Sequence, residues 1–146
     1  MITADRRRSL AAFGWLAAWA ASLPLPAAYV GNRVTYGFDV LALGWLGPLM
    51  LHFGWFANLV LPVAMAAFLF GAAPSRSWPQ VAGWMVLLCG LNSLAWFNIP
   101  DDSGANPITR YGIGYYLWML ATIGGGAWLI ALGRSQRRSS MLMDDK

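Results

Sequence analysis

The residues of this chain that could do chemistry are few, and most of them stand inside or beside long uncharged segments. His52 is the only histidine, Cys89 is the only cysteine, and all six acidic residues are aspartates. A structural zinc site takes four Cys, His or carboxylate ligands, a bis-histidine haem needs two histidines, and a Cys-x-x-Cys disulfide oxidase needs two cysteines. The sequence therefore predicts no metal and no cofactor, and Cys89 cannot form a disulfide within the chain.

Catalytic motifs are also missing from the sequence. No Gly-x-Ser-x-Gly, no paired His and Asp motif and no phosphate-binding glycine loop occurs. No aspartate lies in the middle of an uncharged segment, which argues against a carboxylate-driven proton antiporter resembling the small multidrug family. We therefore predict that the protein is not an enzyme and has no catalytic residues.

Asn58 is the polar residue with the strongest need for a hydrogen-bond partner, because it lies within an uncharged segment that runs from Val40 to Phe70. An amide in apolar surroundings is costly unless it is hydrogen-bonded, so Asn58 should bond across helices or reach water. His52 lies six residues earlier, and six helical steps of 100° put the two side chains about 120° apart. A single site that contains both therefore requires the helix to be altered between them.

Most of the remaining polarity falls at one end of the expected helices, beside the segments that we place outside the membrane. The functional interpretation is an outward-facing polar pocket between two helical hairpins, with His52 as a proton-sensitive member. The alternative interpretation is loop capping, surface ion pairs and a belt of tyrosines at the membrane surface. The candidate pocket residues are Asp39, His52, Asn58, Asn92, Asn98, Asp101, Asp102, Arg110 and Tyr115.

The elements that must position these residues are hydrophobic segments. The chain of 146 residues is 58% hydrophobic and 11% charged, whereas ordinary soluble domains are about 25% charged. Segments of about 20 apolar residues are long enough to cross a bilayer as helices. We therefore predict an all-α polytopic membrane protein with one domain over residues 1–146 and four transmembrane helices arranged as two hairpins. The expected spans are residues 10–30, 48–70, 80–99 and 111–132.

The second of these spans needs a break before it. Val40–Phe70 holds 31 residues, too many for one ordinary crossing and too few for two. Gly47 and Pro48 provide the break, because proline favours the first turn of a helix. We expect Val40–Leu46 to form a short interfacial helix, Pro48 to begin the second span, and Pro62 to kink it.

The basic residues give the orientation. The expected outer loops carry only Arg33 and Arg110, whereas the expected inner side carries eight Lys and Arg residues. This predicts a multi-pass protein of the bacterial inner membrane with both termini in the cytoplasm. The alternative is a cleaved signal peptide, since three arginines precede the first apolar segment and Leu25–Ala28 resembles a weak cleavage site, although that segment is longer than a usual signal sequence. The inner-side residues are Arg6, Arg7, Arg8, Arg76, Arg134, Arg137, Arg138 and Lys146.

Small residues offer faces on which membrane helices can pack closely. They recur on one face of three expected spans, as Gly14, Ala18 and Ser22, as Gly83 and Gly90, and as Ala121 and Gly125. A further hypothesis is an internal repeat of two similar hairpins. It depends on the segments Asn32–Gly37 and Asn106–Gly112, which share the pattern Asn-x-(Val/Ile)-Thr-Tyr-Gly with one inserted residue in the second.

Three short runs stand out in the sequence: Gly-Trp-Leu-Gly-Pro at residues 44–48, Trp-Phe-Ala-Asn at residues 55–58, and Gly-x-Gly-Tyr-Tyr-Leu-Trp at residues 112–118. With these runs the chain resembles a broad group of small four-helix bacterial inner-membrane proteins. The resemblance implies four spans and an inner-membrane location, and it implies no activity.

These features favour a non-enzymatic protein that acts through partners, as an accessory subunit of a membrane complex or as an immunity or protective protein. The expected partners are the lipid bilayer and another membrane protein or a second copy of the chain, bound through the small-residue faces. The net charge of +4 comes from residues at the ends of apolar segments, so nucleic acid is not an expected partner. The alternative function is a small oligomeric transporter or channel for a small molecule or ion, using Asn58, Asn92 and the outer pocket.

Overall fold

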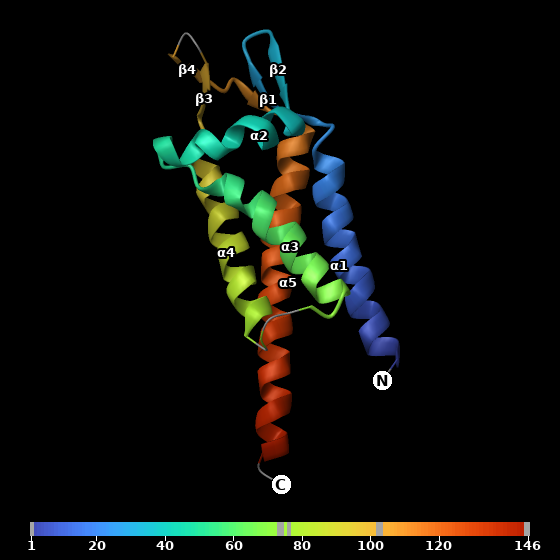
Figure 1. The fold of residues 1–146 in the computed structure, drawn as a ribbon. Coiled ribbons are helices and arrows are strands. Elements are labelled where there is room, and N and C mark those ends of the chain that lie inside the picture. Colours follow the sequence, from blue (N-terminus) through green and yellow to red (C-terminus); the bar gives the residue numbers. More distant parts are fainter. Residues whose placement is uncertain (1, 73–74, 76, 102–103, 145–146) are drawn as a thin grey trace.

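The computed structural model describes residues 2–72, 75, 77–101 and 104–144, which are mostly helical, as the sequence predicts. Four α-helices form a bundle, and the short helix α2 lies across one end of it (Figure 1). The N-terminus, the C-terminal end of α3 and the start of α4 lie toward the opposite end, beyond which α5 projects. The bundle helices are α1 (Ile2–Ser22), α3 (Ala57–Leu69), α4 (Trp78–Asn92) and α5 (Ile113–Asp144), and α2 is Gly37–Leu43.

The core of the bundle is apolar where α5 meets the other helices. Leu61, Met65, Val86 and Leu129 come from three different helices and are all fully or almost fully buried. Helix α5 packs against both α1 and α4 and also contacts α3, so it is the central helix of the bundle.

Glycines permit the close approach of α4 and α5. A Cβ atom on Gly83 would lie 2.7 Å from the carbonyl oxygen of Gly126, and one on Gly90 would lie 3.0 Å from Thr122 Oγ1. Both positions therefore have the packing role expected of them. Gly14 differs, because nothing lies within 4 Å of a Cβ placed there. The expected stripe that begins at Gly14 is therefore packed only over its later part, where Ala18 packs against the core and Ser22 is 2% exposed.

Two small antiparallel sheets cover the end of the bundle where loops were expected. In the first sheet the central strand β1 pairs with both β2 and β5, and Tyr29 lies opposite Val34 on one side and Arg110 on the other. Gly31 has a φ of +56° and makes the turn between β1 and β2. The strands are β1 (Pro26–Val30), β2 (Arg33–Tyr36), β3 (Asn98–Asp101), β4 (Gly104–Pro107) and β5 (Arg110–Tyr111), with β3 pairing with β4.

The helix bounds differ from the expected ones at both ends of the bundle. The first helix ends at Ser22 rather than at residue 30, because Pro24 and Pro26 cannot continue a helix and the following Val and Tyr residues favour a strand. Helix α4, which corresponds to the third expected span, likewise ends early, at Asn92 rather than at residue 99. There the short 3-10 helix η3 (Ser93–Ala95) leads into extended chain. Helix α5, which corresponds to the fourth expected span, continues beyond residue 132 to Asp144. Gly133 does not end this helix but packs against α4, since a Cβ atom placed on it would lie 2.9 Å from the backbone nitrogen of Gln80.

The break before the second span lies later than expected. Residues 44–50 form the 3-10 helix η1, which contains both Gly47 and Pro48, and the chain turns only at Leu51, whose φ is +61°. A second 3-10 helix, η2 (Gly54–Phe56), then leads into α3. The physical reason is a contact from another helix: the Asn92 side chain accepts a hydrogen bond from the Phe53 N–H at 2.6 Å, which fixes the turn at 51–53.

The two hairpins are built differently, so the hypothesis of an internal repeat is wrong. Both copies of the repeated pattern do place a strand, β2 or β5, beside β1. After β2, however, the chain enters α2, which lies across the bundle, whereas after β5 it enters the 32-residue helix α5 directly (Figure 1).

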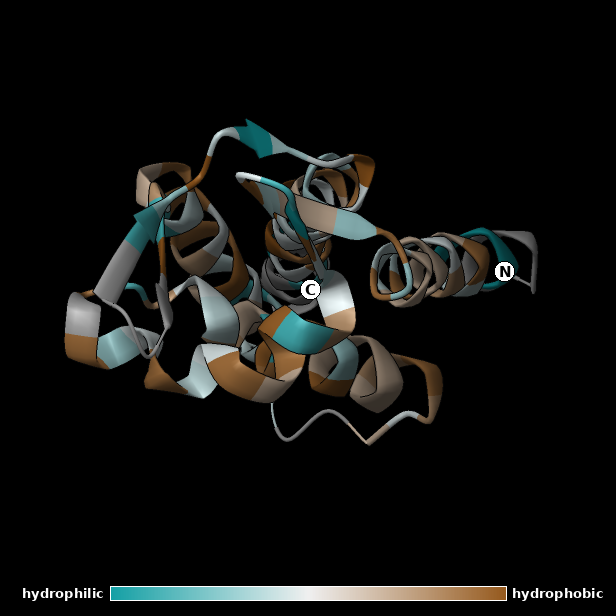
Figure 2. Cartoon of the chain, turned by 90° about the horizontal axis from the view of Figure 1, so that it is seen from above, coloured by the Kyte–Doolittle hydropathy of each residue, from teal (hydrophilic) through white to brown (hydrophobic). Residues whose placement is uncertain are grey.

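Seen from above, much of the helical ribbon has hydrophobic colours, and hydrophilic residues stand out in the strands, in α2 and near the N-terminus (Figure 2). By length and composition, one of the described helices could cross a membrane, over Ile113–Gln136 of α5. Gly37–Leu49 and Gly54–Leu69 are apolar but shorter. A buried core helix of a soluble protein can meet the same criterion.

Candidate functional site

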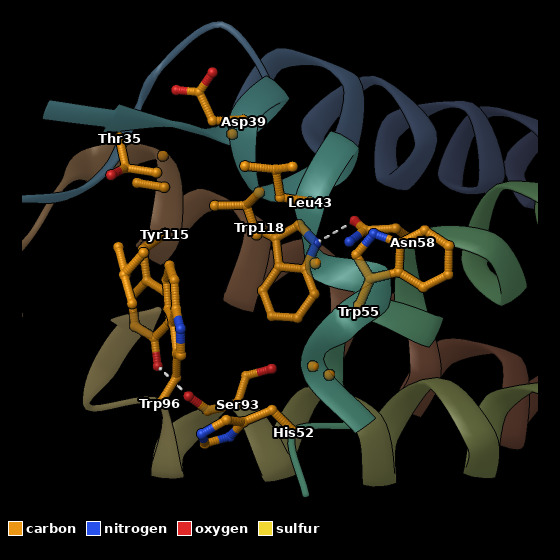
Figure 3. Close-up of a pocket in the computed structure, with 18 of the residues that line it drawn as sticks. Thr35, Asp39, Leu43, His52, Trp55, Asn58, Ser93, Trp96, Tyr115 and Trp118 are labelled. Carbon is orange, nitrogen blue, oxygen red and sulfur yellow. Dashed lines mark hydrogen bonds between the residues drawn. The ribbon is translucent and has the colours of Figure 1, made fainter. Parts of the chain in front are cut away.

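A cavity of about 580 Å³ lies between the bundle helices and α2, at the end of the molecule that carries the strands (Figure 3). Its walls come from the end of α1, from α2 and η1, from the start of α3, from the residues that follow α4, and from the first turns of α5. We call it the capped cavity. Its polar lining residues are Ser22, Thr35, Asp39, His52, Asn58, Ser93, Asn98 and Tyr115, and its aromatic walls are Trp55, Trp96, Trp118 and Tyr115.

Asn58 joins three helices at the wall of the capped cavity. Its Oδ1 accepts hydrogen bonds from the indole N–H of Trp19 on α1 at 2.9 Å and of Trp118 on α5 at 2.6 Å. The residue is 6% exposed, and the expectation that it bonds across helices is confirmed. An indole nitrogen only donates, so both bonds require an acceptor and identify the oxygen of the amide. The amide nitrogen Nδ2 must therefore point away from both indoles.

The aromatic walls are held by bonds to the backbone. The Trp55 indole N–H donates to the carbonyl oxygen of Leu41 at 2.9 Å, which ties η2 to α2. The Tyr115 hydroxyl donates to the carbonyl oxygen of Ser93 at 3.1 Å. Its ring stacks on Tyr111 at 4.4 Å and lies 6.1 Å from the ring of Trp96. These contacts hold the aromatic rings in place in the wall of the cavity.

The turn at residues 51–53 brings His52 into the same cavity as Asn58. A continuous helix would separate the two side chains, but Leu51 is left-handed and the His52 N–H bonds to the Gly47 carbonyl oxygen at 2.9 Å. The Asn92 amide nitrogen also donates to the Leu51 carbonyl oxygen at 3.4 Å. The His52 Nδ1 atom is buried and has no hydrogen-bond partner within the described part of the chain.

The predicted pocket residues fall into three groups. Five line the capped cavity: Asp39, His52, Asn58, Asn98 and Tyr115. Asn92 and Arg110 lie outside its lining, and Asp101 ends strand β3. Asp102 lies outside the described residues.

Two of the charged candidates have structural contacts. Asp39 accepts the Tyr36 N–H at 2.8 Å and caps the first turn of α2. The guanidinium carbon of Arg110 lies 4.2 Å from the centre of the Tyr29 ring, a cation–π contact across β1 and β5. For these two residues the capping and surface interpretation fits the contacts.

Sequence reasoning missed the tryptophans of this site. Trp19 and Trp118 supply the two donors to Asn58, and Trp55 and Trp96 line the cavity. The sequence does contain a signal for them: Asn58 lies in an uncharged segment of a chain that carries nine tryptophans. An indole N–H buried in apolar surroundings needs an acceptor, and the Asn58 amide can provide one.

Burial, together with the neighbouring Tyr116, raises the pKa of the Tyr111 phenol above its ordinary value. Tyr111 is therefore a stable hydrogen-bond donor, and its hydroxyl bonds to the carbonyl oxygen of Trp96. Within the residues that the structure describes, no three His, Cys, Asp or Glu side chains are grouped so that they could hold a metal ion.

The chain matches no protein-family model, no curated protein and no solved structure. The resemblance to small four-helix inner-membrane proteins remains an expectation from the sequence.

Proposed function

We propose that this chain is a multi-pass inner-membrane protein, that α1, α3, α4 and α5 cross the bilayer, and that it acts without catalysis through partner membrane proteins. The observation that carries the proposal is that all four helices of the bundle expose large apolar side chains. Each of the four helices exposes large apolar side chains, for example Phe13 at 63%, Val63 at 58%, Leu88 at 60% and Leu120 at 58%. Soluble monomers rarely expose apolar patches larger than a few hundred Å².

Charge distribution supports the same arrangement. Residues 10–32, 40–75, 77–100 and 111–133 contain no Asp, Glu, Lys or Arg. A charged side chain at the centre of a bilayer costs at least about 2.5 kcal/mol, so four uncharged stretches suit four crossings.

Helix length supports it once the 3-10 turns are counted. Helices α3 and α4 have 13 and 15 residues, which alone are short for a crossing. With η2 and η3 they extend over Gly54–Leu69 and Trp78–Ala95. At ~1.5 Å per residue these lengths are roughly 24 and 27 Å, close to the hydrocarbon core of a thin bilayer.

The basic residues support an orientation with the strands outside. The arginines of α1 and of the last turns of α5 belong to the end of the bundle opposite the strands (Figure 1), and Arg33 and Arg110 belong to the strands. The positive-inside rule places the more basic end in the cytoplasm.

The membrane part of the proposal is tested by labelling single cysteines. In a Cys89→Ser background, Asn32→Cys would mark the β1–β2 turn and Ser75→Cys the opposite end of the bundle. An impermeant maleimide applied to spheroplasts should label position 32 at once and position 75 only after permeabilisation, and the protein should stay in the membrane pellet after alkaline carbonate extraction. Release into the supernatant, or equal labelling of both positions, would contradict it.

Action through partners is supported by the exposed helix faces, since another membrane helix can pack on such a face. Membranes that contain the protein would be cross-linked before mild detergent extraction, and the products separated by size. A heteromer or homomer of fixed stoichiometry is expected. A strictly monomeric protein with no co-purifying partner would count against an accessory or protective role.

A second candidate function is a small transporter or channel, and the capped cavity is the observation that favours it. Below the cavity, Leu61, Met65, Val86 and Leu129 fill the core, so a route would have to run between copies of the chain. Purified protein in liposomes would be compared with empty liposomes for solute flux. Equal flux over a broad panel of ions and small molecules would exclude this alternative.

A further inference from the structure

Asn58 lines the capped cavity, and its amide nitrogen is a hydrogen-bond donor that neither of its two indole partners uses. The two indoles occupy Oδ1 and so fix the orientation of the amide. Both bonds from the indoles use Oδ1, which leaves Nδ2 for a ligand, and the side chain lines the cavity while Asn58 is 6% exposed. A donor held in this way by two other helices is pre-organised to receive an oxygen from a ligand.

The polarity of the cavity selects an uncharged ligand. The one acidic lining residue is Asp39, which is exposed and already caps α2. An anion would meet this carboxylate, and a cation would meet the amide hydrogens of Asn58. A neutral molecule with an oxygen acceptor at its inner end is compatible with both the Asp39 carboxylate and the Asn58 amide.

The walls of the cavity select a flat, apolar body. Trp55, Trp96, Trp118 and Tyr115 present four aromatic rings to a space of about 580 Å³ (Figure 3). This volume lies within the range of small-molecule sites, and such rings favour contact with another ring.

We propose that the capped cavity binds a neutral, lipid-soluble ring compound with a carbonyl oxygen, of the quinone type, and that Asn58 Nδ2 donates a hydrogen bond to that oxygen. The proposal concerns binding alone and includes no redox step. It rests on the proposed function only for the route, since a lipid-soluble ligand would arrive from the bilayer.

Duroquinone is a suitable probe, because its tetramethyl ring is small and its quinone quenches indole fluorescence. Titrated into the purified full-length protein in detergent, it should quench tryptophan emission along a saturable curve. Durene has the same tetramethyl ring without the two oxygens. As a competitor of duroquinone it should bind about tenfold more weakly than duroquinone itself, because it cannot accept the hydrogen bond.

Two substitutions test the role of the amide. Asn58→Asp keeps an oxygen for both indoles, and those donors favour the ionised carboxylate, which has no hydrogen to give. It should weaken duroquinone binding about tenfold or more. Thr122→Val is the matched control, because Thr122 is a fully buried polar residue of the core that bonds to the Trp118 and Met119 carbonyl oxygens and does not line the cavity. It should leave the affinity within about twofold.

The inference would be overturned by quenching that rises linearly without saturation, by equal affinity of Asn58→Asp and the unchanged protein, or by durene competing as well as a quinone. Helical circular dichroism of each variant would establish that it is folded, and Asn58→Leu provides a second loss of the donor should Asn58→Asp fail that check. Binding in detergent does not depend on topology. Failure of the site and failure of the proposed membrane function are therefore separate results.

Discussion

The contribution of inter-helix hydrogen bonds to the stability of the bundle can be tested most directly at the amide of Asn58. Asn58→Leu replaces it with a side chain of similar size, so the substitution leaves little empty space. What it removes is the shared acceptor of Trp19 and Trp118, which lie at 2.9 and 2.6 Å from Oδ1. Both indole N–H groups then lose their partner in the interior of the bundle.

The size of the effect follows from two limits. A buried donor left without a partner costs about 1–3 kcal/mol, so two donors would cost about 2–6 kcal/mol. Hydrogen bonds between helices in a bilayer are worth only roughly 0.6–2 kcal/mol each, since the unfolded helices find other partners. We expect Asn58→Leu to lower the free energy of unfolding by about 2–4 kcal/mol.

The assay is a double-mutant cycle in mixed micelles, with unfolding by SDS followed by circular dichroism. Trp118→Phe removes one of the two donors while keeping a ring in place. The Asn58→Leu and Trp118→Phe double variant should be more stable than the sum of the single effects by about 1–2 kcal/mol, because the lost bond is counted once. Trp84→Phe is the matched control, since Trp84 is 43% exposed on α4 and should change stability by less than about 0.5 kcal/mol.

Additive effects in this cycle would refute the reasoning. Deviations below about 0.5 kcal/mol are what independent sites give. A variant at Asn58 as stable as the unchanged protein would have the same meaning, because the amide would then not hold the helices together.

Three further predictions concern other parts of the fold. Gly83→Ala should destabilise the protein by about 1–3 kcal/mol because its Cβ would press on the α5 backbone, whereas Gly14→Ala, with nothing within 4 Å, should be neutral or stabilising by up to about 1 kcal/mol; SDS unfolding of the pair measures both. Burial raises the folded-state pKa of Tyr111, so the stability it contributes is complete below the unfolded pKa of about 10 and is lost as the pH rises above it; Tyr111→Phe should reduce this alkaline loss in thermal unfolding between pH 8 and 11, and an unchanged loss would show that another group causes it. Asn92→Ala should release the Phe53 N–H, which would appear as faster hydrogen exchange at residues 51–53 and not in α5; unchanged exchange there would mean that the turn is fixed by the local sequence alone.

The existence of the helices could be predicted from the sequence, because uncharged stretches of apolar residues admit few other structures. Their ends could not. The 3-10 turns at Gly54–Phe56 and Ser93–Ala95 replace the outer ends of two expected α-helices, and the break at Leu51 depends on Asn92, which is 41 residues away. A contact of that separation leaves no local pattern. The strands were read as loops for a similar reason, since β1 becomes a strand through pairing with both β2 and β5.

The candidate site was predictable in part. The requirement that Asn58 find partners follows from the cost of a buried amide, and that requirement is met. The identity of the partners was hidden, because tryptophan in a membrane sequence is first interpreted as an interfacial anchor. The pairing of His52 with Asn58 in one cavity was also hidden, since helical geometry placed them apart until the turn at 51–53 was known.

Strand β1 and the amide of Asn58 both connect the part of the chain before residue 72 with the part after residue 77. β1 pairs with β5 of the later part, and Asn58 bonds to Trp118 of the later part. The capped cavity is walled by both parts, while α3 ends and α4 begins on the side of the bundle away from the strands (Figure 1). The molecule is therefore organised as two complementary fragments, and a protein expressed as two separate polypeptides divided at this point should reassemble with its cavity intact.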